Sequence, residues 1–335
     1  MDVTILIPTL NRSFFIDKLL TYYEKFNFLG KIIIIDSSSQ EELNINKSRV
    51  EKSRLNITHL PLISDEFYAM AKGIELIGTE YAIHSGDDDY FSVSGIKKLI
   101  NYLEKNKNFI SAGGKSITVS YNSNSKIIKG SAFYNLPIKN QVEAVDRLKS
   151  IKRYEQLPVY VIYRSSIIKK IYHNLHTNQE FSINYRRNFN EYLWRLLPPI
   201  LGQGKLFNKI FFLVRFQTDQ KYIRKELSDI RDDGFNKIYK KSLKNLKAVS
   251  SAENKGNKIY EISKKIFKSF VAGQLQSNCF IRFQKKLYLI KFICIYLMNR
   301  VANKGKKIHN YYTHKMSPYY EEELDFILNL LVKKK

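Results

Sequence analysis

Three consecutive aspartates, Asp87, Asp88 and Asp89, follow a short apolar run in the stretch YAIHSGDDDY, residues 81–90. Carboxylates this close repel one another unless a positive charge lies among them. In an extended stretch residues i and i+2 face the same side, so Asp87 and Asp89 would point together and Asp88 away. Two hard oxygen ligands on one side suit Mg²⁺ or Mn²⁺, with phosphate oxygens and water completing the coordination. The alternative is a solvated acidic turn in which Asp89 caps the next helix.

The elements before the aspartates decide between these two interpretations. Short β-branched runs predict strands and helical spacing predicts helices: strands at 3–8, 31–36, 57–62 and 80–85, and helices at 14–26 and 65–78. This alternation predicts an α/β fold with a mostly parallel sheet flanked by helices. Ligands bind such sheets at the carboxyl ends of the strands, where TLNR, DSSS and GDDDY stand. Three segments would meet at one edge, which favours the metal site.

The rest of the chain divides into two parts. Strands and helices continue up to about residue 217. Helices are predicted at 95–105, 141–150 and 188–205. Strands are predicted at 156–164 and 209–217, and two more around the turn NSNS within 109–134. The double proline at 198–199 is expected to end its helix. After 218 the sequence is Lys-rich, with helical spacing around 223–230, 260–275 and 321–335. We predict a catalytic domain at 1–217 and a basic, mainly helical region at 218–335.

The net charge is the unusual feature of the composition. Fifty-six Lys and Arg face thirty-one Asp and Glu among 335 residues, a formal charge of +25. Such an excess favours polyanionic partners such as nucleic acid, anionic lipid headgroups or phosphorylated substrates. The alternative explanation for any single surface lysine is that an AT-rich genome favours a Lys- and Ile-rich composition.

Location is predicted from cysteine use and hydropathy. The two cysteines, Cys279 and Cys294, argue against a disulfide framework and suit a reducing compartment. The opening residues lack a signal-peptide pattern, and no apolar stretch reaches membrane-spanning length. We therefore expect a cytoplasmic protein. The apolar, cationic stretch KKLYLIKFICIYLMNR, residues 285–300, suits an interfacial helix on an anionic inner membrane face, or a core helix whose lysines reach outwards.

Several common site signatures are absent from the sequence. No G-x-G-x-x-G follows the first strand, and G-x-x-x-x-G-K-[ST] and G-x-S-x-G occur nowhere. Dinucleotide, P-loop and serine-nucleophile sites therefore lose their usual support. Neither cysteine has a second one or a histidine cluster beside it, which argues against zinc.

The N-terminal part, roughly residues 2–215, resembles family 2-type glycosyltransferases with the GT-A fold. The matching stretches are TILIPTLNR, IIIIDSSS and AKGIELIGTEYAIHSGDDD, while DDDY, LPVYVIYR and NEYLW resemble a bacterial subgroup linked to surface polysaccharide assembly. The resemblance implies a metal-dependent, inverting enzyme. It would move a sugar from a nucleoside-diphosphate sugar to a hydroxyl of a glycan or lipid-linked acceptor.

The resemblance also implies roles for individual residues. Asp87 and Asp89 would hold Mn²⁺ or Mg²⁺, with Asp88 near the ribose or behind the metal ligands. The nucleotide would lie beside Thr9, Asn11 and Asp36. Inverting members carry a general base about a hundred residues after the D-x-D motif, and Glu191, 102 positions after Asp89, would begin a helix on the acceptor side. The alternative is that Glu191 is an ordinary first-turn carboxylate.

The sequence departs from the family pattern at two places. The usual DDGS is DSSS here, and the usual ARNxG is AMAKG, with Met70 and Ala71 in place of Arg and Asn. Phosphate neutralisation would then fall to Lys72 or Arg215.

Other polar residues have weaker claims on the site. His176 is a candidate third metal ligand, although an ordinary surface or core histidine is the stronger interpretation. Arg186 and Arg187 could bind a phosphate-bearing acceptor or form a solvated basic turn.

Two rival functions share part of this evidence. A nucleotidyltransferase that makes an activated sugar would use the same strand order and metal aspartates, but such enzymes open with a Gly-rich loop that PTLNRS lacks. A non-enzymatic nucleic-acid-binding protein would explain the charge of +25 and leave the acidic strand ends without a purpose. A nucleic-acid partner is therefore not favoured.

Overall fold

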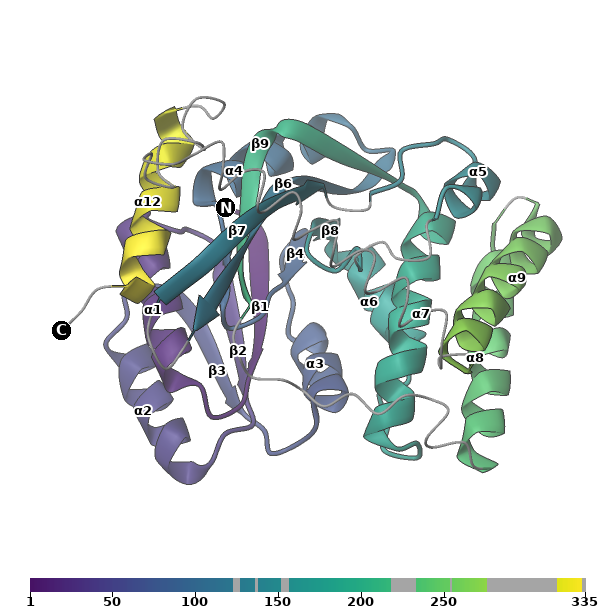
Figure 1. Ribbon diagram of the computed structural model, residues 1–335, viewed down its shortest axis with the longest axis horizontal. Helices are drawn as coiled ribbons and strands as arrows, with labels where there is room; N and C mark the ends of the chain where they lie inside the picture. The colour runs from purple at the N-terminus through teal and green to yellow at the C-terminus, as the bar shows by residue number, and fades with distance from the viewer. Residues whose placement is uncertain are drawn as a thin grey trace.

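The computed structural model describes residues 1–122, 127–135, 138–151, 157–217, 233–253, 255–275 and 318–332. Helices and strands alternate through the first half, and helices follow the last strand (Figure 1). In chain order the elements are β1 (Val3–Thr9), α1 (Ser13–Lys25), β2 (Lys31–Asp36), α2 (Gln40–Glu51), β3 (Asn56–Pro61), α3 (Glu66–Glu75), β4 (Tyr81–His84), β5 (Asp89–Phe91), α4 (Val93–Lys105), β6 (Phe109–Asn122), β7 (Ile127–Asn135), α5 (Ala144–Lys149), β8 (Ile162–Arg164), α6 (Ser165–His173), α7 (Ile183–Leu201), β9 (Gln203–Gln217), α8 (Asp233–Ser251), α9 (Gly256–Leu275) and α12 (Pro318–Val332).

The described strands form one mixed sheet whose first four strands are parallel. Their order is β3-β2-β1-β4-β8-β6-β9-β5, with β7 paired to β6. Strands β3, β2, β1 and β4 run in the same direction, whereas β8 pairs antiparallel with β4, and β5 antiparallel with β9. The carboxyl ends of β1, β2 and β4 therefore lie side by side, as the sequence predicted.

Apolar runs and amphipathic helices explain why these segments form this sheet. The interior residues of β1 and β2 are mostly buried and apolar, with isoleucine at most positions, as expected for strands covered on both faces. Helix α3 packs so closely on them that a Cβ at Gly73 would lie 2.3 Å from Ile35 Cδ1 and 2.7 Å from Leu6 Cδ1. Glycine at this position lets the helix backbone approach the sheet.

Several elements differ from the sequence predictions. Helix α7 begins at Ile183 and includes the double proline in its last turn, so the prolines end the helix within that turn. Strand β8 covers only Ile162–Arg164, and β9 begins at Gln203. Helices α2 and α6 and the short strand β5 were not predicted. Helix α2 has Asn46 as its one buried residue and hence no apolar face to detect.

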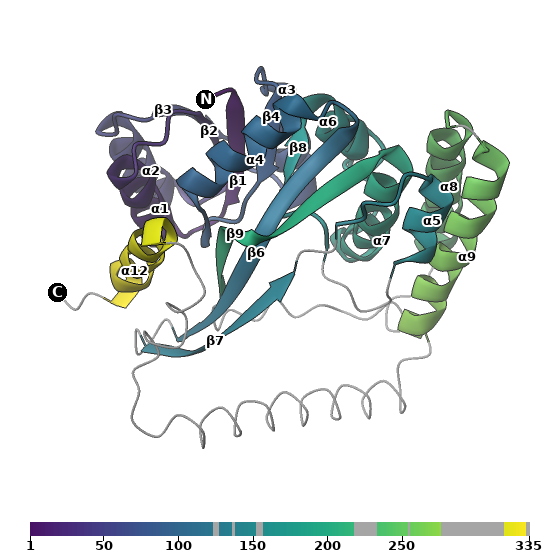
Figure 2. The ribbon, with the colours of Figure 1, turned by 90° about the horizontal axis from the view of Figure 1, so that it is seen from above.

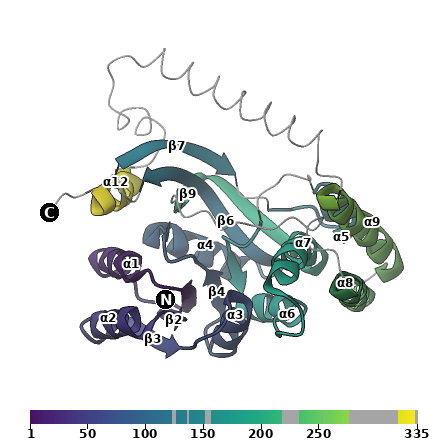
Figure 3. The same cartoon turned by 60° about the horizontal axis from the view of Figure 1, so that its bottom comes forward.

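The helices after β9 belong to the same hydrophobic core. Helices α8 and α9 follow α7 on the side of the molecule away from α1 and α2 (Figures 1 and 3). The rings of Phe235 and Phe267 lie 5.7 and 5.9 Å from that of Phe189. Helix α12 lies beside α1 (Figure 2), where the rings of Phe326 and Phe26 are 5.5 Å apart.

Two of the predicted segments lie outside the residues that the structure describes. The predicted boundary at 217/218 coincides with the end of β9, but the helix expected at 223–230 and the stretch 285–300 lie outside the described residues. Within the described ranges, none of the helices combines the length and the hydropathy needed to span a membrane.

Candidate functional site

The loops after β1, β2 and β4 meet at the carboxyl edge of the sheet. Asn11 has a left-handed backbone (φ 54°), a conformation that asparagine tolerates better than most residues. Its backbone N–H donates to Ser38 Oγ (2.8 Å), and its Oδ1 accepts from the Ser39 N–H (2.7 Å). Thr9 Oγ1 donates to Asp87 Oδ2 at 2.8 Å. The three polar junctions noted in the sequence therefore converge.

Asp87 and Asp88 form a tight turn between β4 and β5, and Arg12 bridges them. Its Nη1 donates to Asp87 Oδ1 and its Nη2 to Asp88 Oδ2, both at 2.6 Å. Asp89 lies in β5 and accepts from Arg215 Nε and from the Gly86 N–H, both at 3.3 Å. Asp88 therefore lies on the same side as Asp87, contrary to the expectation that it points away. Alternation requires an extended chain, and this stretch turns.

Burial and charge crowding dominate the electrostatics of the turn. Asp87 and Asp89 are 4% and 3% exposed. Burial raises the pKa of Asp87 to about 7, against the lowering effect of Arg12, and Asp88 adds to the rise. Burial likewise raises the pKa of Asp89 to about 6, against Arg215. Among the described residues, three carboxylates face two guanidinium groups in direct contact, so the fully ionised cluster is negative by one charge.

Arg215 belongs to this site and Lys72 does not. Arg215 stands opposite Asp89 in the β5–β9 ladder, and its guanidinium lies 4.0 Å from the Tyr160 ring centroid. Arg215 Nη2 also donates to the Tyr160 hydroxyl at 3.0 Å. Lys72 points elsewhere: its Nζ pairs with Glu75 on the same helix at 3.2 Å.

Asp36, at the end of β2, has both of its carboxylate oxygens in hydrogen bonds. Oδ1 accepts from the Ser38 N–H (3.0 Å), and Oδ2 accepts from Asn46 Nδ2 (2.8 Å) and lies 3.0 Å from His59 Nε2. The side chain is fully buried. Burial by itself would raise the Asp36 pKa, but the hydrogen bonds from His59, Ser38 and Asn46 outweigh it and lower the pKa to about 2. Asp36 thus fixes the loop after β2 and the position of His59.

Glu191 lies in the middle of α7, not at the start of a helix. The helix begins eight residues earlier, where the Ser182 hydroxyl accepts from the Tyr185 N–H. Arg187, Glu191 and Trp194 are spaced four and three residues apart and so share one face. Arg187 Nε binds Glu66 Oε1 at 3.1 Å, and the Trp194 ring lies 6.4 Å from His84 at the end of β4. Glu191 therefore lies on α7 between Arg187, which contacts Glu66, and Trp194, which contacts His84.

The other sequence candidates have structural partners away from the aspartates. His176 is buried with its Nε2 2.7 Å from Ser242 Oγ on α8, so it is not a third metal ligand. Arg186 is also buried: its Nη1 donates to Asp65 Oδ1 at 2.7 Å. Together with Arg187 it ties α7 to the start of α3, so the expected solvated basic turn is wrong.

Arg12 is the site residue that the sequence analysis missed. The stretch TLNR was assigned to the site through Thr9 and Asn11, and the arginine beside them was given no role. A signal was available, because a basic residue in one converging loop is the natural counter-ion for an acidic turn in another.

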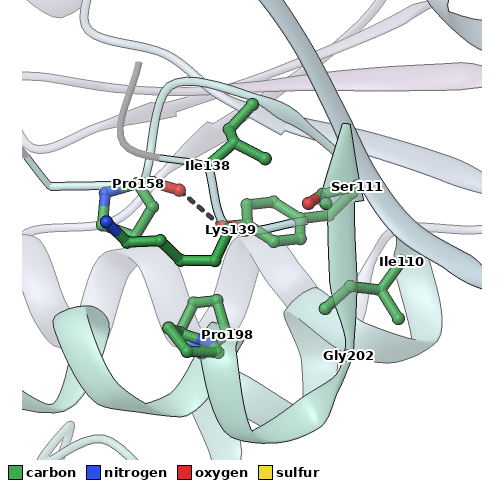
Figure 4. Close-up of a pocket in the computed structure, with 10 residues that line it drawn as sticks. Ile110, Ser111, Ile138, Lys139, Pro158, Pro198 and Gly202 are labelled. Atoms are coloured by element: carbon green, nitrogen blue, oxygen red, sulfur yellow. Dashed lines mark hydrogen bonds between the residues drawn. The ribbon is translucent and has the colours of Figure 1, made fainter. Parts of the chain in front are cut away.

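A small, partly open pocket lies elsewhere in the molecule (Figure 4). Its volume is about 20 Å³, which holds about one water molecule. The lining residues are Ile110, Ser111, Ile138, Lys139, Pro158, Tyr163, Pro198, Pro199, Gly202 and Gly204. None of them belongs to the carboxylate turn, and a sugar would not fit.

The donor set of the turn fits a hard divalent cation. Among the described residues no group of three or more His, Cys, Asp or Glu side chains forms a ready-made metal cage. Mg²⁺ needs no such cage, since it is commonly bound by one or two carboxylates together with substrate phosphates and water. The turn supplies carboxylates and a net negative charge. Two of the carboxylate oxygens are bound by Arg12.

A mixed sheet whose first four strands are parallel, flanked by helices, places the chain in the GT-A class of fold. Within this class, the chain is similar to S. aureus TarS 1–349 in complex with UDP-GlcNAc: 14% identity, 83% of this chain and 76% of that chain covered, TM-score 0.52. A second structure of S. aureus TarS 1–349 gives 12% identity over the same shares, with a TM-score of 0.49. No family model and no curated protein matches the chain. The likeness establishes the fold.

Proposed function

We propose that this protein is a metal-dependent, inverting glycosyltransferase that uses a nucleoside-diphosphate sugar as donor. The observation that carries the proposal is the buried turn of three aspartates at the carboxyl edge of a GT-A sheet, which is negative by one charge when all three are ionised beside their two arginines. The fold likeness to a protein crystallised with UDP-GlcNAc supports a nucleotide-sugar donor. The acceptor would be a hydroxyl of a glycan or a lipid-linked glycan in cell-surface polysaccharide synthesis.

Residues of three loops would bind the donor. Asp87, Asp88 and Asp89 would hold Mg²⁺ or Mn²⁺, which when bound neutralises the charge of the departing diphosphate. Arg215 lies next to Asp89 and would add a positive charge beside the same phosphates. Asn11, hydrogen-bonded to Ser38 and Ser39, would shape the surface for the nucleoside. Asp36 would act indirectly, by fixing that loop and His59.

Glu191 would provide the base for the transfer. Its carboxylate would accept the proton of the acceptor hydroxyl while that oxygen attacks the anomeric carbon. The bond between the anomeric carbon and the diphosphate oxygen breaks in the same displacement, so the nucleoside diphosphate leaves and the configuration inverts. The position of Glu191 on the face of α7 that reaches Glu66 and His84 supports this role.

The proposed location is the cytoplasm, with peripheral attachment to the inner membrane face. A lipid-linked acceptor would be met there, and the charge of +25 favours an anionic surface.

A nucleotide-sugar screen tests the proposed function. We expect one class of nucleoside-diphosphate sugar to raise the thermal unfolding midpoint in Mn²⁺ and much less in EDTA, and Asp89→Ala to abolish the effect. Turnover of a nucleoside triphosphate with a sugar 1-phosphate would instead support the nucleotidyltransferase. Tight, salt-sensitive binding to DNA without any nucleotide effect would contradict both enzymes.

A further inference from the structure

We propose that Arg12 competes with the divalent cation for Asp87 and Asp88, and that the released guanidinium then binds the donor diphosphate. The inference rests on the proposed function, because it concerns the same metal and the same donor. It assigns to Arg12 a control over metal affinity, because its guanidinium binds two of the proposed ligands at once.

The first argument is the geometry of the bridge. One guanidinium spans two consecutive carboxylates, with one N–H group on Asp87 Oδ1 and the other on Asp88 Oδ2, each at 2.6 Å. Charge-assisted bonds of this length are strong. The remaining oxygen of Asp87 accepts from Thr9. A cation that bound both carboxylates would therefore need oxygens that Arg12 now holds.

The second argument is charge. A dication bound to the two carboxylates would lie within a few ångströms of the Arg12 guanidinium if Arg12 stayed in place, and like charges at that distance repel. Releasing Arg12 removes the repulsion. The two cations therefore alternate on the turn.

The third argument is that the Arg12 side chain has room to leave the two carboxylates. It lies immediately before α1, and its guanidinium packs at 4.2 Å from the Phe15 ring centroid with 19% of the side chain exposed. A long side chain on such a support can turn towards solvent without unfolding the loop. A released guanidinium next to a metal-bound diphosphate has the planar fork of N–H groups that matches phosphate oxygens.

Arg215 makes a different contact and serves as a comparison. It donates to Asp89 alone, at 3.3 Å, and is also held by the Tyr160 hydroxyl and ring. Its position in the β9 ladder fixes its backbone opposite Asp89. Arg215 can neutralise the turn while a cation is bound to Asp87 and Asp88, whereas Arg12 cannot.

The test is a titration of the nucleotide-free protein with Mn²⁺, followed by electron paramagnetic resonance of free Mn²⁺ or by calorimetry. We expect Arg12→Gln to bind Mn²⁺ at least tenfold more tightly than wild type. We expect the same variant to bind UDP at least tenfold more weakly when Mn²⁺ is saturating. Arg54→Gln removes an equal charge from an exposed arginine after α2 and should leave both dissociation constants within twofold.

The outcomes separate this inference from the proposed function. Equal or weaker Mn²⁺ binding by Arg12→Gln, with Mn²⁺-dependent UDP binding retained, overturns the competition and leaves the transferase standing. No Mn²⁺ binding by any variant, with UDP bound equally in EDTA, overturns the competition and the metal requirement together. If Arg12→Gln does not fold, Arg12→Lys takes its place: it keeps the charge and loses the fork, so Mn²⁺ should bind more tightly than in wild type, though less tightly than expected for Gln.

Discussion

Asp36 shows how a residue expected to touch a ligand can act by holding others in place. Its two oxygens receive hydrogen bonds from Ser38, Asn46 and His59, and the side chain is fully buried. A buried carboxylate with this many partners stabilises the folded state as long as it is ionised.

The pKa of Asp36 makes this stabilisation depend on pH. Because the folded pKa is about 2 and the ordinary value is 3.8, the stabilisation is complete above pH 4 and is lost as pH falls through 2. We expect Asp36→Asn to cost about 2 kcal/mol at pH 7, with a difference from wild type that shrinks towards pH 2. Thermal unfolding midpoints of both proteins between pH 7 and 2 check this. A constant difference across that range would contradict it.

Glu191 carries the second residue-scale prediction. Glu191→Gln keeps the size of the side chain and removes the base, so sugar transfer should fall by a factor of about 10² to 10⁴. UDP binding in Mn²⁺ should stay within twofold, because the base acts on the acceptor. Glu180→Gln, at a surface glutamate that pairs with Lys241, is the control and should keep full activity. A fully active Glu191→Gln would exclude Glu191 as the base.

At the scale of elements, a buried carboxylate of α12 binds residues of α1 and α4. Glu323 accepts from the Tyr22 hydroxyl at 2.9 Å and from the backbone N–H groups of Val93 at 3.1 Å and Ser94 at 3.0 Å. These N–H groups begin α4, which has no acidic residue in its own first turn. Glu323 thus supplies the negative charge that the positive end of the α4 dipole favours.

This contact predicts a difference between two adjacent glutamates. Glu323→Gln should lower the free energy of unfolding by about 1–3 kcal/mol, since a charged acceptor is lost from buried donors. Glu322→Gln, at the exposed neighbour, should leave it nearly unchanged. Thermal unfolding of the full chain measures both. Equal midpoints for the two variants would show that the Glu323 contact adds nothing to stability.

At the scale of the whole molecule, the excess of basic residues includes a row of lysines along α8. Lys237, Lys240, Lys244 and Lys247 are exposed and are spaced three and four residues apart, opposite the buried face of the helix. After Asp233 this helix contains no acidic residue. Like charges at these spacings destabilise a helix, so an anionic surface would relieve a repulsion within the helix itself.

The proposed membrane attachment can be tested on this row. Replacing the four lysines by glutamine should weaken binding to phosphatidylglycerol-containing vesicles at least tenfold, since each lysine near an anionic surface contributes about 1 kcal/mol. A matched variant loses the same charge elsewhere, at Lys97, Lys105, Lys107 and Lys170. Co-sedimentation at two salt concentrations compares them. Equal losses in both variants would mean that only total charge matters.

Local pattern was enough for the sequence to determine the sheet and its polar edge. The signals used were local: the apolar runs of β1 and β2, the helical spacing of α1 and α3, and the aspartates directly after β4. Each of them involves residues only a few positions apart in the sequence. The resemblance in TILIPTLNR and GDDD added the fold class. The likeness to TarS and the strand order confirm that fold.

The tertiary structure alone decided which side chains meet. Arg12 reaches aspartates 75 and 76 positions away, and Glu323 reaches the start of α4 across 229 positions or more. Asp36 was expected beside the nucleotide, but its Oδ2 contacts Asn46 and His59. A turn of the chain placed Asp88 next to Asp87 on Arg12. The spacing of residues along the chain determines on which face of its own helix or strand each side chain lies. The partner on that face depends on how separate loops fold against one another, which no local pattern contains.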